Sequence, residues 1–505
     1  MSYKIKFLRS GVLLTAVALA MKTVGMFFGA YISREVGAEG VGLYTVVMTV
    51  YSFALTLATS GISLTVTRLV ASALGEGRPS EISKILKGAL LYSGFFGFLS
   101  SLLLFFGAGF IGDGILFDGR TVDSLKILAF SLVPISLSSV YSGYFIGVKR
   151  VGFNAAVSVF GQLLKIIVTV ILVSIAMPYG IGTAVAALCL GIVVSELLSF
   201  LLIFIEFVFD RKRHPESKSK ESSAALIPIG KMALPLAFSA YVRSILISVE
   251  HILIPKRLKD RGESSSEAYS HYGILHGMAI PLVLYPMTPL SSFSGLLVPE
   301  FSEDMSAKRN GRMSRIASLA LNTTLFYAVV TSVLIFSFSG ELGYLIYDSY
   351  DAGYYIAMLA PVVPIMYLDH VTDQVLKGLG EQVYSMWVNI SDSLLSVALI
   401  YLLIPRLGIT GYAVVIIVME GYNFILSYIR LRKKASFSIS LYKSFLLPIA
   451  LSLLSVFVTK RVFLFSGKDV SVVWFVFKIL FSLCVFVSLY VTLGLKKNKI
   501  KSSVA

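Results

Sequence analysis

The strongest constraint on this chain is a succession of fourteen apolar segments, each bounded by charged residues or by glycine and proline. Crossing a bilayer as a helix takes about 20 residues, and these segments are long enough. Hydrophobic residues make up 56% of the chain and charged ones only 14%, which is unlike a soluble protein. We therefore predict an all-α polytopic membrane protein with fourteen transmembrane helices. The expected spans are residues 11–32, 43–70, 87–111, 122–146, 154–177, 181–208, 227–254, 272–298, 316–338, 352–376, 385–404, 409–431, 442–459 and 469–494.

The distribution of basic residues indicates the orientation of these spans. If the spans alternate in direction, the even-numbered loops and the two termini hold most of the 44 lysines and arginines. Cytoplasmic loops are enriched in lysine and arginine, so both termini are predicted to be cytoplasmic. The formal net charge of +16 follows from this orientation, and we expect no nucleic-acid partner.

A polar, charge-rich linker at residues 210–223 divides the fourteen spans into six and eight. A shift of 231 residues aligns the segment that starts at Gly42 with the one at Gly273. Two pseudo-symmetric six-helix lobes with a substrate site at their interface are typical of transporters. The expected parts are an N-lobe at 1–209, a cytoplasmic linker at 210–226, a C-lobe at 227–435, and two C-terminal helices with a cytoplasmic tail at 436–505.

Basic residues in the middle of spans are candidates for function, because a charge at the bilayer centre costs about 2.5 to 3.5 kcal/mol. Lys22, Lys165 and Arg243 lie nearest the middle of their spans. A shift of 221 residues makes Lys22 and Arg243 equivalent, so we expect two cations to face each other and bind an anionic ligand. A structural ion pair with a buried carboxylate is the alternative for each. Arg68, near the cytoplasmic end of its span, either attracts an anionic headgroup or follows the basic bias of that side.

Most acidic residues of the spans fall in the second half of the chain, with Glu196 in the first. The candidates for ion coupling are Glu250, Asp369, Asp373, Asp392 and Glu420. Asp369 and Asp373 are one helical turn apart, and such a pair can carry a proton or a sodium ion. Pairing with the basic residues of the spans remains an equal alternative.

Three prolines, Pro281, Pro286 and Pro289, interrupt the eighth span. Each removes a backbone hydrogen bond, so we predict a bent helix there. A bent helix beside a cavity suits a gating motion, although bends also occur in static spans.

Catalytic motifs such as Walker A, HExxH and GxSxG are missing from the sequence. Both cysteines lie inside apolar segments, so we expect no metal site, cofactor or thiol chemistry. The longest outer loop, residues 256–271, holds Asp260, Glu263, Glu267 and His271. These residues leave a membrane glycan polymerase or acyltransferase open as a less favoured class.

Four stretches carry a resemblance to a known family. They are residues 33–78, which begin with SREVGAEGVGLY, residues 234–258, LPLAFSAYVRSILISVEHILIPKRL, residues 272–303, which begin with YGILHGMAIPLVLYPMTPLSS, and residues 405–413, PRLGITGYA. The chain resembles the stage V sporulation protein B group of polysaccharide transporters, within the multidrug/oligosaccharidyl-lipid/polysaccharide exporter superfamily and related to the lipid II flippases. The similarity covers almost the whole chain.

The resemblance implies a fourteen-helix flippase whose cationic cavity takes the pyrophosphate-linked sugar of a polyprenyl carrier. Lys22, Arg68 and Arg243 match or lie near the basic cavity positions, and Arg34 matches the basic residue before the Gly-x-Glu-Gly turn. Many relatives have arginine where this chain has Lys22, and lysine binds phosphate without a bidentate fork. The resemblance also implies that the last two spans form a groove for the polyprenyl tail.

We therefore predict an alternating-access flippase or exporter of the plasma membrane, and not an enzyme. Its expected substrate is an anionic lipid-linked oligosaccharide or peptidoglycan precursor, with a role in sporulation and with cell-wall synthesis enzymes as partners. A cation-coupled small-molecule or multidrug exporter is the alternative. The membrane potential and a cation gradient are both open as energy sources.

Overall fold

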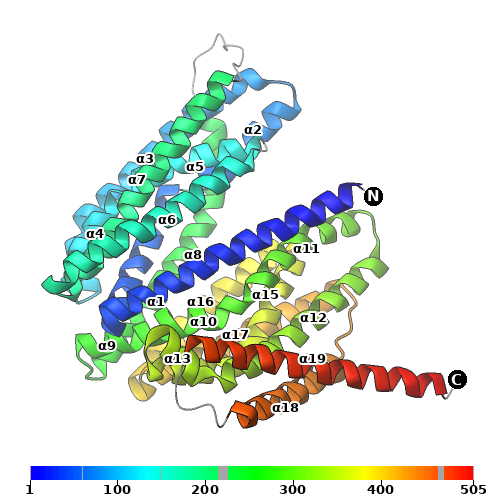
Figure 1. Cartoon of the computed structure of the whole chain (residues 1–505). Coiled ribbons are helices and arrows are strands. Elements are labelled where there is room, and N and C mark those ends of the chain that lie inside the picture. Colours follow the sequence, from blue (N-terminus) through cyan, green and yellow to red (C-terminus); the bar gives the residue numbers. More distant parts are fainter. Residues whose placement is uncertain (1, 60, 149, 214–225, 464–470, 504–505) are drawn as a thin grey trace. The chain divides into compact units, whose positions relative to one another are not determined.

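The computed structural model describes the whole chain except residues 1, 60, 149, 214–225, 464–470 and 504–505 (Figure 1). Every regular element among the described residues is a helix, which confirms the all-α prediction. In that part of the chain, eleven helical segments are long and apolar enough to cross a membrane. The number becomes twelve if the bent pair Arg120–Ala129 and Leu132–Gly147 counts as one span.

The count of fourteen spans stays a prediction. Two of the expected spans, 11–32 and 43–70, overlap one continuous segment, Leu19–Gly75. A third, 227–254, lies in helix α8 (Leu226–Asp260), which is not among the eleven.

The chain divides into two compact units, each assembled from segments that are far apart in the sequence. Unit 1 consists of Met1–Arg34, Ile274–Leu399 and Arg406–Ala505. Unit 2 consists of Glu35–Gly273 and Ile400–Pro405. These boundaries differ from the lobes expected at 1–209 and 227–435, and the lobe assignment stays a prediction.

Only the ends of the expected linker at 210–226 are described. Helix α7 (Ile181–Arg213) continues into its first residues, and α8 begins at Leu226. Residues 214–225 lie outside the described part of the chain. Asp210, expected in the linker, is instead a buried helical residue, which accepts hydrogen bonds from Tyr144 and Arg150.

Unit 2 contains the second part of α1 (Ser2–Thr59) and the helices up to α9. These helices are α2 (Ile62–Gly75), α3 (Ile82–Gly109), α4 (Arg120–Ala129), α5 (Leu132–Gly147), α6 (Val151–Ala176), α7, α8 and α9 (Ser265–Tyr272). A core that includes Ile62, Val66, Tyr144 and Phe145 joins several of them. Glycine allows close packing here, since a Cβ on Gly143 of α5 would lie 2.6 Å from the carbonyl oxygen of Ser63 in α2.

The glycine-rich turn expected after the first span is a one-residue break. Gly37 has φ 67° and ψ −179° inside α1, a conformation that glycine adopts most readily. Five residues further on, Gly42 packs against Gly273. A Cβ added to Gly273 would lie 2.6 Å from the backbone nitrogen of Gly42. These are the two glycines that the internal repeat makes equivalent.

One end of unit 2 is held by charged residues. Arg120, at the start of α4, donates hydrogen bonds to the carboxylates of Asp118 and Glu39, with N–O distances of 2.7 Å in both ion pairs. Ser266 of α9 donates to the other oxygen of Glu39 at 2.6 Å. These contacts connect α1, α4 and α9.

Unit 1 contains the first part of α1 and the helices after Gly273. They are α10 (Ile280–Leu284), α11 (Thr288–Ser306), α12 (Asn310–Ser337), α13 (Ser339–Tyr347), α14 (Tyr350–Leu359), α15 (Val363–Gly378), α16 (Gln382–Leu407), α17 (Ile409–Lys434), α18 (Leu447–Val462) and α19 (Val472–Ser503). Its core includes Leu321, Val375, Leu376 and Leu431, from α12, α15 and α17.

The three prolines of the eighth expected span interrupt its helix, as predicted. A π-helical segment η4 (Gly273–Ala279) leads into α10, a short 3₁₀ segment η5 (Tyr285–Met287) comes next, and α11 begins at Thr288. Pro281, Pro286 and Pro289 each occupy one of the first two positions of a new segment. The span is therefore a succession of short helical pieces.

Residues 256–271, expected to form the longest outer loop, are mostly helical, because α8 extends to Asp260 and α9 starts at Ser265. The acidic residues of this stretch all have structural partners. Asp260 pairs with Arg257 at 2.7 Å, and Glu263 lies 3.0 Å from His271. Glu267 forms a capping box with Ser264 at the start of α9. This arrangement accounts for these residues without a catalytic role.

Candidate functional site

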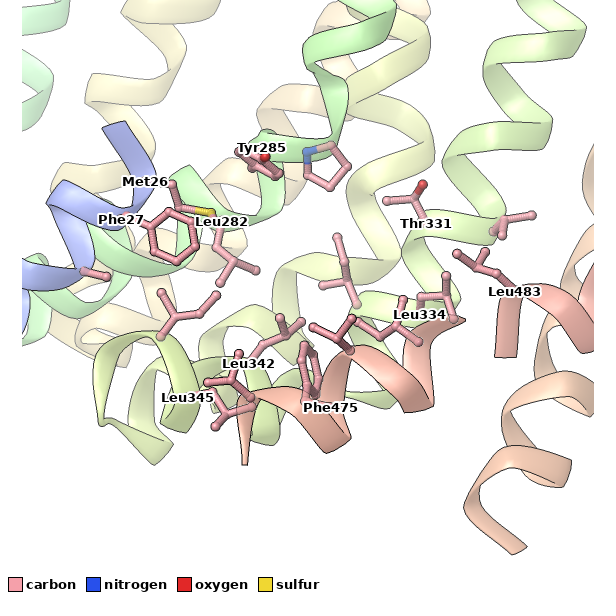
Figure 2. Close-up of a pocket in the computed structure, with 18 of the residues that line it drawn as sticks. Met26, Phe27, Leu282, Tyr285, Thr331, Leu334, Leu342, Leu345, Phe475 and Leu483 are labelled. Carbon is pink, nitrogen blue, oxygen red and sulfur yellow. The ribbon is translucent and has the colours of Figure 1, made fainter. Parts of the chain in front are cut away.

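Unit 1 contains an apolar cavity of about 880 Å³ that is partly open to its surroundings. Figure 2 shows side chains from several helices converging on it, among them Phe27, Leu282, Thr331, Leu342 and Phe475. The lining comes from α1, α10, η5, α12, α13 and α19, and almost all of it is hydrocarbon. A volume of this size is at the upper end of the range for ligand sites, and such a lining suits a long apolar chain.

One face of α1 forms a wall of this cavity. Met26, Phe27, Ala30, Tyr31 and Arg34 line it, and this spacing places all five on one side of a helix. Arg34 is the one basic residue among the described residues of the lining, and it donates a hydrogen bond to the Leu345 carbonyl oxygen of α13.

Lys22 precedes Met26 by one turn on the same face of α1, and its side chain is exposed. The twelve residues from Lys22 to Arg34 span about 18 Å of helix. The apolar wall that α1 contributes therefore has a cation near each end. Such a face can hold an acidic group at either end of an apolar chain.

The proline-interrupted segment supplies another wall. Tyr285 and Pro286 of η5 line the cavity. The Tyr285 hydroxyl lies 2.6 Å from the Thr23 hydroxyl of α1. Tyr327 of α12 donates to the Pro286 carbonyl oxygen at 2.8 Å. Thus the prolines predicted to bend this span place two of its residues at the cavity.

Helix α19, the last of the chain, closes the cavity on another side. It contributes Val472, Phe475, Val476, Ile479, Leu483, Phe486 and Val487. Phe486 also packs with Val330 of α12 and Leu451 of α18. Lys478 forms an ion pair of 2.7 Å with Glu341 of α13, so two walls of the cavity are joined by opposite charges. Of the last two helices, α19 thus lines the cavity directly, and α18 supports it by packing against Phe486.

The four basic residues predicted to bind substrate are all exposed, but they belong to different units. Lys22 and Arg34 lie in unit 1, whereas Arg68 on α2 and Arg243 on α8 lie in unit 2. The structure places Lys22 and Arg34 on one helix face. The pairing of Lys22 with Arg243 stays a prediction.

The candidates for ion coupling divide in the same way. Asp369, Asp392 and Glu420 come from α15, α16 and α17 of unit 1, and Glu420 interacts electrostatically with both aspartates. The Oδ1 atom of Asp369 is buried without a hydrogen-bond partner among the described residues. No group of His, Cys, Asp and Glu in the described part of the chain has the geometry of a metal site.

Asp373 and Glu250 have other surroundings. Asp373 pairs with Lys377 one turn later at 2.6 Å and also interacts electrostatically with Asp369, so the carboxylate pair stays a prediction. Glu250, in unit 2, interacts electrostatically with Tyr272, whose hydroxyl lies 3.1 Å from His251 Nδ1. Glu250 is therefore outside the group formed by the acidic residues of unit 1.

Most of the cavity has no signal in the sequence. Lining residues such as Phe326, Leu334 and Ile479 are of the same types as residues that face lipid elsewhere in the chain. Only α1 offered a signal, because Lys22 and Arg34 bracket an apolar face. Their spacing of twelve residues places both on the helix before its break at Gly37.

Comparison with known proteins gives the family of the chain. Residues 7–305 match the family described as Polysaccharide biosynthesis protein, and residues 276–402 match the MatE family. The chain belongs to the polysaccharide biosynthesis protein family. The first match covers more than half of the 505 residues, which confirms the resemblance predicted from residues 33–78 and 234–258.

Individual relatives extend the similarity over most of the chain. Stage V sporulation protein B of Bacillus subtilis (strain 168) is 28% identical over 417 residues, covering 81% of this chain and 80% of that protein. Lipid II flippase MurJ of the same organism is 20% identical, covering 75% of this chain and 74% of that protein. This polysaccharide biosynthesis protein is therefore a multi-pass membrane protein of the flippase and exporter class, and not an enzyme.

A solved structure supports the fold. The structure of a lipid II flippase MurJ in an inward closed conformation superposes with a TM-score of 0.72 at 16% identity. The match covers 94% of this chain and 97% of that one. At this level of identity the likeness shows the polytopic helical fold and does not extend to the substrate.

Proposed function

We propose that this protein moves an anionic lipid-linked oligosaccharide or peptidoglycan precursor across the plasma membrane by alternating access. The observation that carries the proposal is the apolar cavity of about 880 Å³ in unit 1, with Arg34 in its wall. An apolar chain gains roughly 25 cal/mol for each Å² that it buries. A polyprenyl tail is a ligand of that kind.

The headgroup of such a carrier is a pyrophosphate, for which Lys22 and Arg34 are suitable partners. Arginine binds phosphate oxygens with a planar fork, while lysine acts as a point charge. A tail lying along the face of α1 brings its headgroup near one end of that face. Arg68 and Arg243, both exposed in unit 2, are proposed to contact the same headgroup during transport.

The acidic group of unit 1 is proposed to couple transport to an ion. Asp369, Asp392 and Glu420 lie on three helices, and Glu420 is within electrostatic range of both aspartates. Repulsion among carboxylates in a low-dielectric interior is relieved by a proton or a bound cation. We include Asp373 and Glu250 as further candidates that respond to the same gradient through Lys377 and Tyr272.

Localisation follows from the proposed substrate. The resemblance implies that the headgroup moves from the inner to the outer leaflet, so we propose that the protein lies in the plasma membrane. The excess of basic residues in the even-numbered loops supports cytoplasmic termini. The name of stage V sporulation protein B supports a role in sporulation. Cell-wall synthesis enzymes that consume the exported precursor are proposed as partners.

A translocation assay in reconstituted vesicles tests the proposal. The substrate is a polyprenyl pyrophosphate carrying a labelled disaccharide, and outward movement is read by accessibility to an external quencher. Because hydrogen bonds to charged groups contribute about 1.5 to 3 kcal/mol each, Lys22→Gln with Arg34→Gln should slow transport at least tenfold. Arg243→Gln alone should also slow transport if the predicted cation pair serves one headgroup.

The matched control is Arg432→Gln with Lys433→Gln, which removes two exposed charges at the end of α17 in the same unit. Transport by this control should equal that of the unmodified protein. Equal transport by the Lys22/Arg34 variant would rule out the proposed role of these residues. Absence of any movement of the carrier by the unmodified protein would rule out the substrate.

A cation-coupled exporter of small molecules is the second candidate, favoured by the match of residues 276–402 to the MatE family. It predicts ion-gradient-dependent efflux of a dye from the same vesicles. Dye efflux without carrier movement would favour this candidate.

A further inference from the structure

A second cavity, of about 330 Å³, lies inside unit 2 and is lined mainly by polar side chains. Its walls come from α2, α5, α6 and α7, and half of its lining residues are serines. Ser138 of α5 has a buried hydroxyl without a hydrogen-bond partner among the described residues. A buried polar group in this state is an exception in folded proteins and has room for a ligand contact.

Two charged residues also line this cavity, Lys165 of α6 and Glu196 of α7. They interact electrostatically and are half-buried. No hydrogen bond or ion pair involving either of them is found in the part of the chain that the structure describes. Each charge therefore faces the cavity with its hydrogen-bonding capacity unused.

The sequence holds a signal for this cavity. Ser158, Gln162 and Lys165 recur at intervals of four and three residues, which makes one polar face on α6. Glu196 and Ser199 do the same on α7. The two faces approach closely, because a Cβ on Gly161 would lie 2.4 Å from the Ser199 hydroxyl oxygen.

We propose that this cavity binds a small zwitterion, whose anionic end faces Lys165 and whose cationic end faces Glu196. A ligand with a single charge is attracted by one of the two residues and repelled by the other, whereas a zwitterion satisfies both. Its remaining polar atoms meet hydroxyl groups that both donate and accept hydrogen bonds. A charge of each sign in a low-dielectric cavity makes these contacts charge-assisted and strong.

Binding to the purified full-length protein in nanodiscs tests this site. The probes are alanine, β-alanine and 4-aminobutyrate, which separate the two charges by increasing lengths, with glucose and sodium chloride for comparison. At least one zwitterion should raise the melting temperature in a saturable way, as a ligand of the folded state does. Glucose and sodium chloride should give no saturable shift.

Lys165→Met and Glu196→Gln should each weaken zwitterion binding at least tenfold. Lys126→Met and Glu206→Gln, which remove like charges in unit 2 away from the cavity, should not. Reversing the pair with Lys165→Glu and Glu196→Lys should restore binding to within tenfold, since the ligand can turn around. Ser142→Leu keeps both charges but fills the cavity, so it should abolish zwitterion binding. This variant still tests the site if a charge variant fails to fold.

Several results overturn the proposal. They are no zwitterion binding by the unmodified protein, stronger saturable binding of glucose or sodium than of any zwitterion, or binding that persists in Ser142→Leu.

Discussion

The apolar cavity of unit 1 and the polar cavity of unit 2 differ in size, polarity and charge. The cavity of unit 1 is large and almost wholly apolar, with Arg34 in its wall, whereas the cavity of unit 2 is smaller and lined by serines with Lys165 and Glu196. The first gains its affinity from buried area, and the second from a few directed contacts. Similar apolar helices therefore form two sites of opposite chemistry, depending on which helix faces meet.

The largest effect is expected from a charge placed inside the apolar cavity. Val476 of α19 lines it, and Val473 of the same helix does not. A lysine at an apolar depth costs about 2.5 to 3.5 kcal/mol, so Val476→Lys should weaken binding of an isoprenoid pyrophosphate roughly a hundredfold. Val473→Lys is the matched control and should bind normally. Equal affinities of the two variants, measured by calorimetry in nanodiscs, would contradict the assignment.

A smaller effect should distinguish the contribution of the headgroup to binding from the contribution of the apolar tail. Arg34→Gln removes a charged contact worth about 1.5 to 3 kcal/mol, so an isoprenoid pyrophosphate should bind at least tenfold more weakly. The corresponding neutral isoprenoid alcohol should bind as before, because its tail meets the same apolar wall. Competition between the two lipids gives this ratio directly. A parallel loss for the alcohol would mean that Arg34 acts only by holding α1 to α13.

The sequence predicted the apolar helices and the breaks at prolines, because hydropathy and backbone chemistry are local. It also predicted Lys22 as a candidate, since a cation within an apolar span stands out, and Arg34 through the resemblance of residues 33–78 to a known family. It did not predict the cavity, whose walls depend on contacts such as that between Glu341 and Lys478, 137 residues apart. Gly37 was expected in a turn, but one glycine with a positive φ is enough to break α1.

Loss of the ion pair between Lys478 and Glu341 should have a smaller effect, and this effect should be on the stability of the fold. It joins two walls of the apolar cavity, and each side chain is roughly a quarter exposed. Lys478→Met should reduce stability by about 2 kcal/mol, between the values for exposed and buried pairs. Lys478→Met with Glu341→Gln should recover part of the loss, since no charge then remains unpaired. Thermal unfolding followed by a cysteine-reactive dye measures both, and an unchanged midpoint for Lys478→Met would contradict the expectation.

The smallest expected effect is a change in how stability depends on pH below neutrality, and it should be confined to unit 2. Burial opposes the ionisation of Asp118, but hydrogen bonds from Arg120 outweigh it and hold the pKa of Asp118 below its usual range. The pair therefore stabilises the fold fully above the unfolded-state pKa of about 4, and this contribution is lost as the pH falls through the lower folded-state value.

Asp118→Asn should reduce stability at pH 7 by about 1 kcal/mol and make it depend less on pH below 4. Hydrogen exchange resolves the effect by unit. Protection should fall in α4 and α9 and stay unchanged in α12 and α19. A uniform loss in both units would show that the cavity of unit 1 depends on this charged end.

The most direct test of the central claim is to map where the carrier lipid binds. A photoreactive isoprenoid pyrophosphate, crosslinked to the protein in nanodiscs and located by mass spectrometry, reports its neighbours. We predict labelling at Thr331 and Val476, removed by an excess of unlabelled polyprenyl pyrophosphate. Labelling confined to exposed residues such as Leu103 of α3, or labelling without competition, would contradict the account.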